Sequence, residues 1–212
     1  MYFLLTGLIG LTSCKPCRSP EHKRLGPESL TYFGSQKNGS WWVFERKSDR
    51  ARDSVYLTNY SRQTERPIDI NVCYDLEAVR YQLVGKGVLC QRSIVTIDAR
   101  GSIDQVNFVD NGINNPLFYF SLYTANNQGF ERGPYADFER LTSYTVNGVS
   151  YPNVTKVYAK APQYNRSGAM TYVVWRTLYI TPEVGLIRAE YIPTSQGGVR
   201  ETYDLIKYSI VH

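Results

Sequence analysis

From residue 30 onward, short hydrophobic runs alternate with segments rich in Gly, Asn, Asp and Pro. Within residues 186–192 the apolar side chains of Ile187, Ala189 and Tyr191 fall at every second position, with charged residues between them. A period of two residues is typical of a β-strand with one buried face. Other runs rich in aromatic and β-branched residues recur along the chain, which predicts a protein built mainly of strands.

Several connections between these runs carry the residues of antiparallel hairpins. Asn147-Gly148 separates two runs, and both residues tolerate the positive φ angles of a type I′ turn. Pro182 and Gly185 mark another tight connection, at which we expect Gly185 to have a positive φ angle. The runs on either side of this turn and the run at 200–211 follow one another closely, which predicts an antiparallel meander.

Helix signals are few. Residues 75–80 contain Leu76 and Val79 at helical spacing, with Asp75 as a cap, but the same residues also fit a strand. No repeat, coiled-coil heptad or membrane-spanning run is present in the sequence. The sequence therefore predicts a single mainly-β domain over residues 30–212. We expect an antiparallel curved sheet, an open barrel or a sandwich of about ten strands, with at most one or two short helices.

The first 14 residues form a different kind of segment: they are uncharged and contain the apolar run 3–11. This run is shorter than the ~20 residues of a transmembrane helix, and it is typical of the hydrophobic region of a secretory signal peptide. Only Met1-Tyr2 precedes it, without the usual Lys or Arg, so either the true start lies upstream or the signal is unusual. The alternative is a buried first strand with a chance cysteine.

Leu11-Thr12-Ser13-Cys14 resembles the lipobox of bacterial lipoproteins. The resemblance implies that residues 1–13 are a signal peptide and that acyl chains on Cys14 anchor the protein to a membrane. Residues 14–29 would be a lipidated tether, because Pro, Gly and charged residues occur there without an apolar period. Basic residues follow Cys14 where some lipoproteins carry an acidic cluster for surface display. We therefore expect a place in the bacterial cell envelope, facing the periplasm.

Cys73 and Cys90 lie in the body of the chain, and in an oxidising compartment they could form a disulfide. A simple hairpin that turns at residues 85–87 would hold the two thiols beyond bonding distance. The disulfide therefore requires a helix or a bend near residues 75–80. The alternative is two buried free thiols. Cys17 falls in the tether.

The net charge is +5, from 24 Lys and Arg against 19 Asp and Glu. The densest basic cluster, at residues 46–52, is interleaved with acidic residues. A nucleic-acid interface requires basic charge that is not cancelled locally. We therefore expect no nucleic-acid partner, and we interpret this cluster as a solvated loop between strands.

The folded body lacks histidine, since His22 falls in the tether and His212 is the last residue. Nucleophilic triads and the common zinc sites therefore lack their imidazole, and we expect no metal, no cofactor and no enzyme activity. Carboxylate catalysis needs only two acids, and the candidates by residue type are Asp98, Asp104, Asp110, Asp137 and Glu139. Their spacing singles out no acid and base, and Asp is common at strand ends and turns.

The chain has 18 tyrosines, many of them between residues 119 and 172. They could form a surface for sugars or lipid headgroups, or they could simply cover a half-exposed sheet. We expect at least two of Trp41, Trp42 and Trp175 to belong to the core.

Three stretches, at residues 39–44, 146–154 and 178–191, resemble small uncharacterised Gram-negative envelope lipoproteins. In those proteins a Gly-x-x-Trp motif near the start and a hairpin containing Gly-Leu-Ile-Lys/Arg near the end recur. The resemblance implies a mainly-β domain, such as the open barrel of periplasmic lipoprotein carriers, and no reaction. The sequence thus favours a membrane-anchored, non-catalytic binding or structural module for an apolar (lipid), glycan or protein ligand. The alternative is a carboxylate-based hydrolase of envelope glycans.

Overall fold

The computed structural model describes residues 20–66, 73–85, 87, 92–100, 103–110, 120–125, 129–131, 136–164, 167–192 and 200–212. Thirteen strands form one sheet within these residues. The only helical segments among them are α1 (Pro27–Ser29) and the π-helical turn η1 (Leu30–Gly34). The prediction of a mainly-β antiparallel fold is confirmed.

The strands occur in the following order. Those of the first half are β1 (Glu21–Lys23), β2 (Trp41–Arg46), β3 (Arg52–Glu65), β4 (Tyr74–Gly85), β5 (Arg92–Arg100), β6 (Ile103–Asp110) and β7 (Phe120–Ala125). Those of the second half are β8 (Gly129–Glu131), β9 (Ala136–Val146), β10 (Val149–Tyr164), β11 (Met170–Thr181), β12 (Gly185–Tyr191) and β13 (Glu201–Ser209).

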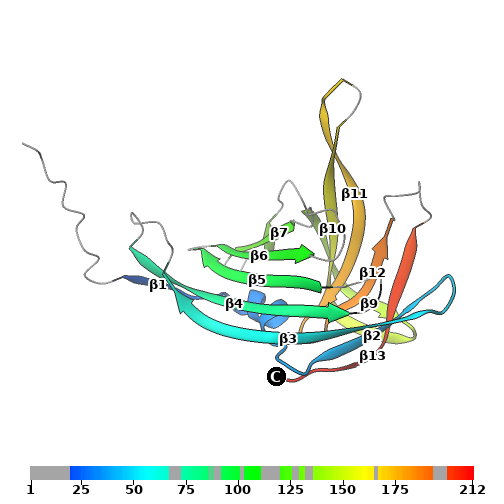
Figure 1. Ribbon diagram of the computed structural model, residues 1–212, viewed down its shortest axis with the longest axis horizontal. Helices are drawn as coiled ribbons and strands as arrows, with labels where there is room; N and C mark the ends of the chain where they lie inside the picture. The colour runs from blue at the N-terminus through cyan, green and yellow to red at the C-terminus, as the bar shows by residue number, and fades with distance from the viewer. Residues whose placement is uncertain are drawn as a thin grey trace, which may run out of the picture.

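Twelve strands pair antiparallel in the order β8-β7-β6-β5-β4-β3-β2-β13-β12-β11-β10-β9. Every neighbouring pair is also consecutive in the chain, except β2 and β13. β1 lies off this path and runs parallel to β4, with Glu21 opposite Tyr74. The sheet curls into a half-barrel, so that β10 and β11 stand across the direction of β4, β5 and β6 (Figure 1).

Two predicted turns are present. Asn147 and Gly148 have φ angles of 48° and 81°, and they join β9 to β10 with Val146 directly opposite Val149. Gly185 begins β12 with a φ angle of 84°, which confirms the predicted conformation. Residues 75–80, which fitted both a helix and a strand, belong to β4, because this strand can bury Val79 and Tyr81 on one face.

One hydrophobic core covers a single face of the curled sheet, called the core face below. Its fully buried side chains include Leu57 on β3, Val79 on β4, Ile97 on β5 and Ile187 on β12. Each such side chain contributes about 1.5–3 kcal/mol relative to an exposed one.

The tryptophans divide between the core and the surface. Trp42 is buried, and its indole N–H donates to the carbonyl of Val184 at 2.7 Å. Trp41 is half-buried, with the Lys207 ammonium 5.6 Å from its ring centroid. The side chain of Trp175 lies outside the described residues.

The segment that the sequence assigned to a tether is partly built into the sheet. Residues 21–23 form β1 on the edge of β4, and Leu25 and Ser29 are buried. Leu25, Tyr32 and Phe33 belong to the same buried cluster as the core face. Residues 21–29, which the sequence placed in the tether, therefore pack with the sheet.

Candidate functional site

Two carboxylates on the sheet hold the N-terminal segment against the core face. Glu77 on β4 accepts the backbone N–H of Leu25 at 3.0 Å, and Asp104 on β6 accepts that of Gly26 at 2.7 Å. Asp104 is only 1% exposed. Hydrogen bonds from backbone N–H groups to carboxylates are strong, so one of the predicted candidate acids has a structural partner.

The far end of the same segment is bound to the second half of the sheet. The Tyr32 hydroxyl donates to the carbonyl of Asn153 at 2.6 Å, and the Gln36 amide donates to the carbonyl of Glu183 at 3.2 Å. Burial raises the pKa of Tyr32, which keeps its hydroxyl a donor. Residues 25–36 thus span from β4 and β6 to β10 and the turn before β12. The apolar residues around Phe33 could have indicated that this segment is buried. They do not alternate with polar residues as in a strand, so this burial was not predicted from the sequence.

Asp98 and Asp104, two of the candidate catalytic acids, lie on neighbouring strands but not on the same face of the sheet. Asp98 pairs in register with Gln105, and Asp104 with Ala99, so Asp98 and Asp104 project from opposite faces of the β5–β6 pair. The side chain of Asp110 lies outside the described residues.

Asp137 and Glu139 share one face of β9, but each has a cation beside it. Lys160 Nζ is 2.5 Å from Asp137 Oδ2, and Lys156 Nζ is 4.0 Å from Glu139 Oε2. Tyr158 also donates to Glu139 at 2.9 Å. The structure therefore separates Asp98 from Asp104, whereas Asp137 and Glu139 lie on one face and each has a lysine beside it.

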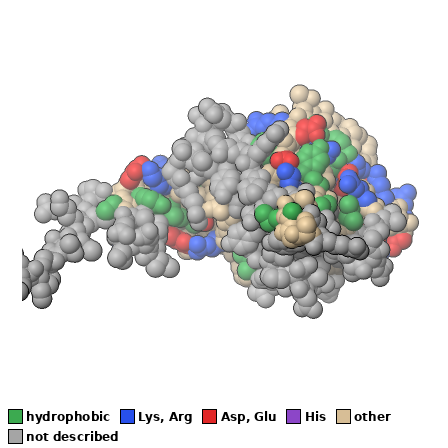
Figure 2. All heavy atoms as spheres, turned by 90° about the horizontal axis from the view of Figure 1, so that it is seen from above, with side chains coloured by type: hydrophobic (Ala, Val, Ile, Leu, Met, Phe, Trp, Pro, Cys, Tyr) green, Lys and Arg blue, Asp and Glu red, His purple; other side chains and the backbone are tan. Residues whose placement is uncertain are grey.

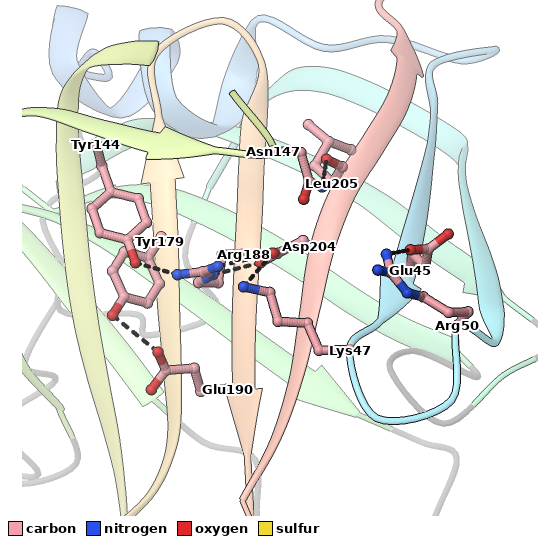
Figure 3. A network of polar contacts seen from close by, with 10 residues as sticks. All are labelled: Glu45, Lys47, Arg50, Tyr144, Asn147, Tyr179, Arg188, Glu190, Asp204 and Leu205. Carbon is pink, nitrogen blue, oxygen red and sulfur yellow. Dashed lines mark hydrogen bonds and ion pairs between the residues drawn. The ribbon is translucent and has the colours of Figure 1, made fainter. Parts of the chain in front are cut away.

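A polar network lies on the face of β12 opposite to Ile187 and Ala189, and Figure 3 shows it from close by. The Arg188 guanidinium binds the Asp204 carboxylate through two nitrogens, with Nη2 at 2.8 Å from Oδ2. Lys47 Nζ lies 3.1 Å from the same carboxylate. Asp204 is 2% exposed, so β13 carries a buried carboxylate that is neutralised by two cations.

Two stacked tyrosines complete this network on the other side of Arg188. The rings of Tyr144 and Tyr179 are stacked, with centroids 4.5 Å apart. Arg188 donates to the Tyr144 hydroxyl and lies 5.9 Å from the Tyr179 ring. The Tyr179 hydroxyl in turn donates to Glu190 at 3.1 Å (Figure 3). The network joins β9, β11, β12 and β13.

The pKa values in this network move away from neutrality. Burial raises the pKa of Tyr179, and the nearby Glu190 carboxylate raises it further. Burial alone would raise the pKa of Asp204, but hydrogen bonds from Arg188 and Lys47 outweigh it and hold this pKa below its usual value. General acid–base catalysis is most effective with a pKa near the working pH. This arrangement can therefore fix four strands relative to one another, but neither group is prepared for proton transfer at neutral pH.

The basic cluster at residues 46–52 is ion-paired. Arg46 Nη2 lies 2.6 Å from Asp49 Oδ2, and Arg50 Nη1 lies 2.6 Å from Glu45 Oε1. The described part of the face in Figure 2 likewise shows Lys and Arg side chains mixed with Asp and Glu. This charge is cancelled locally, as the sequence suggested.

Among the described tyrosines of the predicted ligand surface, the side chains do not form a common exposed platform. Tyr151 is buried, Tyr144 belongs to the polar network, and Tyr158 binds Glu139. The side chains of the tyrosines at 119, 123, 135, 164 and 172 lie outside the described residues.

Cys73, directly before β4, forms a disulfide. Cys14, Cys17 and Cys90 lie outside the described residues, so the predicted lipid attachment and the partner of Cys73 fall there. Residues 74–85 form one continuous strand, so the helix or bend required for a bond between Cys73 and Cys90 is not found at 75–80.

In the part of the chain that the structure describes, no group of three or more His, Cys, Asp or Glu residues could hold a metal ion. No helix in that part is long and apolar enough to cross a membrane. No family model matches the chain, and no curated protein or solved structure is significantly similar to it. The function must therefore be inferred from the residues themselves.

Proposed function

We propose that this protein is a lipid-anchored lipoprotein of the bacterial cell envelope. The observation that carries the proposal is the lipobox-like Leu11-Thr12-Ser13-Cys14, which ends an apolar run too short to span a bilayer. Cleavage before Cys14 would leave this cysteine as the first residue, with acyl chains that partition into a membrane. The basic residues after Cys14 favour the periplasmic side over the cell surface.

The anchored domain serves as a non-catalytic binding or structural module for a lipid, glycan or protein ligand. Support for this role comes from the use of its described acids: Asp104 binds the backbone of Gly26, and Asp204 is neutralised by Arg188 and Lys47. A glycosidase would need two carboxylates about 5–10 Å apart and free to act on one bond. We therefore favour the binding role over the hydrolase.

The anchor is tested by growing the expressing cells with radiolabelled palmitate and separating their membranes. The unmodified protein is expected to carry label and to sediment with membranes. Cys14→Ala is expected to lose the label and to keep its leader, because the acylated thiol is absent. Cys17→Ala is the matched control, since it removes a thiol three positions away and should keep the label. Label on Cys14→Ala, or its loss from Cys17→Ala alone, would overturn the assignment.

A further inference from the structure

The hairpin of β10 and β11 is longer than the strands beside it. β9 pairs with β10 only as far as Ala159, and β12 pairs with β11 only from Arg176. Beyond these points, residues 160–164 and 170–174 pair with each other and with no other described strand. Five residues of strand extend roughly 17 Å. This part of the hairpin, called the free ribbon below, rises away from the sheet in Figure 1.

The free ribbon exposes apolar side chains on both of its faces. Met170 is 50% exposed and Val173 is 45% exposed. Because they are three positions apart in one strand, they project from opposite faces. The described tip, residues 167–169, consists of small, exposed residues. A two-stranded ribbon is at best marginally stable in water, so apolar groups on both faces favour a partner that can surround the ribbon.

The charge around the ribbon identifies the chemistry of that partner. Residues 160–182 contain no Asp or Glu and three basic residues, Lys160, Arg166 and Arg176. Asp137 neutralises Lys160 at the base of the ribbon, whereas the sequence nearer the tip has no acidic residue. A lipid bilayer with negatively charged headgroups and an apolar interior matches this combination of apolar and basic side chains.

We propose that the free ribbon inserts into the surface of a bilayer that contains anionic phospholipid. This inference deepens the proposed function and rests on it, since the acyl chains on Cys14 would hold the domain at a membrane and the ribbon would add a second contact. The apolar side chains of Met170 and Val173 would enter the acyl boundary, while Arg166 would interact with phosphate groups. Each basic residue near an anionic surface adds about fivefold to binding.

The test uses residues 15–212, the chain after the proposed lipid attachment site, so that neither acyl chains nor the apolar leader can contribute. The chain is mixed with vesicles of phosphatidylcholine alone or with phosphatidylglycerol added, and amide hydrogen exchange is followed in peptides from residues 160–175. We expect these peptides to become protected only with the anionic vesicles, and less at high salt. The peptide that covers the turn at Asn147-Gly148 is expected to exchange equally in both.

The ribbon variant is Met170→Asp with Val173→Asp, and Met170→Ser with Val173→Ser provides a milder second version. Both place polar groups at exposed positions and are expected to weaken anionic vesicle binding, the Asp version by about tenfold or more. Val149→Asp is the matched control, because Val149 is 52% exposed on the other hairpin turn, and it should bind like the parent.

Three results would overturn the proposal. They are equal exchange with and without vesicles, unchanged vesicle binding by the ribbon variants, and protection that appears without lipid as the protein concentration rises. The last would identify the ribbon as a contact between copies of this chain. If palmitate labelling fails but the ribbon is protected by anionic vesicles, only the lipid anchor on Cys14 is rejected. The two proposals are therefore distinguishable.

Discussion

Gly185 shows how a residue type can predict backbone conformation. The Pro182 and Gly185 pattern predicted a tight turn, and the φ angle of 84° at Gly185 agrees with it. Asn147 and Gly148 were predicted in the same way. Arg50 and Glu183 also have positive φ angles, 63° each, but nothing in their residue types indicates it. The Arg50 N–H donates to the carbonyl of Arg46 within its own turn, whereas the Glu183 N–H donates to the carbonyl of Thr31 in the distant segment η1.

Gly185→Val is expected to lower the free energy of unfolding by about 1–3 kcal/mol, because a β-branched residue is strained at this φ angle. A Cβ at Gly185 would meet only ordinary contacts, with Gln36 Nε2 at 3.7 Å and Trp42 Cζ2 at 4.0 Å, so the loss should come from the backbone. Gly185→Asn is the control and should lose less, since Asn tolerates this region. Denaturant unfolding measures both. Equal loss for Val and Asn would show that crowding, and not backbone strain, is the cause.

At the scale of elements, the sequence predicted strands better than it predicted what covers them. The hairpins β9–β10 and β11–β12 were identified from their turn residues, and the alternation at Ile187 and Ala189 identified the buried face of β12. The segment at residues 25–34 was missed, because its side chains fill a space defined by distant strands. Proline and glycine near its ends indicated a tether, whereas Leu25, Tyr32 and Phe33 make it part of the core.

The pair between Arg188 and Asp204 joins β12 to β13 directly across the sheet, and it should be important for stability. Asp204→Ala would leave the Arg188 guanidinium, 13% exposed, without its carboxylate. Breaking a buried pair in this way costs about 3–5 kcal/mol. The double variant Arg188→Met with Asp204→Ala is expected to lose less, because the only cation that loses its carboxylate is then Lys47, whose side chain is 56% exposed to solvent. Denaturant unfolding of the three proteins at neutral pH measures both effects.

The same pair predicts a dependence on pH. The pKa of Asp204 is lower in the folded protein than its ordinary value, so its contribution is present above the unfolded pKa of about 4 and is lost as the pH falls through the folded value. The difference in stability between the unmodified protein and Asp204→Ala should therefore shrink in acid. A difference that stays constant between about pH 6 and pH 2 would contradict the role of this carboxylate.

At the scale of the whole molecule, two pairings between distant segments determine the architecture. β2 pairs with β13 and thereby joins the beginning and the end of the domain, and β1 pairs with β4. The alternation of apolar and polar residues shows which face of a strand is buried. It does not show which distant strand pairs with that strand. The local meander was therefore predictable from the sequence, whereas the half-barrel and the place of the N-terminal segment on it were not.

The pairing of β1 with β4 also predicts the partner of the Cys73 disulfide. The backbone N–H of Glu21 donates to the carbonyl of Cys73 at 3.2 Å, so the chain enters β1 beside Cys73, and Cys17 is only four residues before Glu21. Cys90 precedes Arg92, which pairs with Val84 near the opposite end of β4. β4 has 12 residues, or roughly 36–40 Å of extended chain, whereas a disulfide requires Cα atoms within ~7 Å.

We therefore expect Cys73 to be bonded to Cys17, with Cys14 left for the lipid and Cys90 free. Peptide mapping by mass spectrometry without reduction is expected to find a peptide with Cys73 joined to one with Cys17, and alkylation should label Cys90. Cys17→Ser should leave Cys73 reactive toward the same reagent, whereas Cys90→Ser should not. A bond between Cys73 and Cys90 would contradict the strand register of β4 and β5. If the expected bond is present, only two residues separate the lipid on Cys14 from the covalent attachment to the sheet at Cys17, so the domain would lie close to the membrane that its free ribbon is proposed to enter.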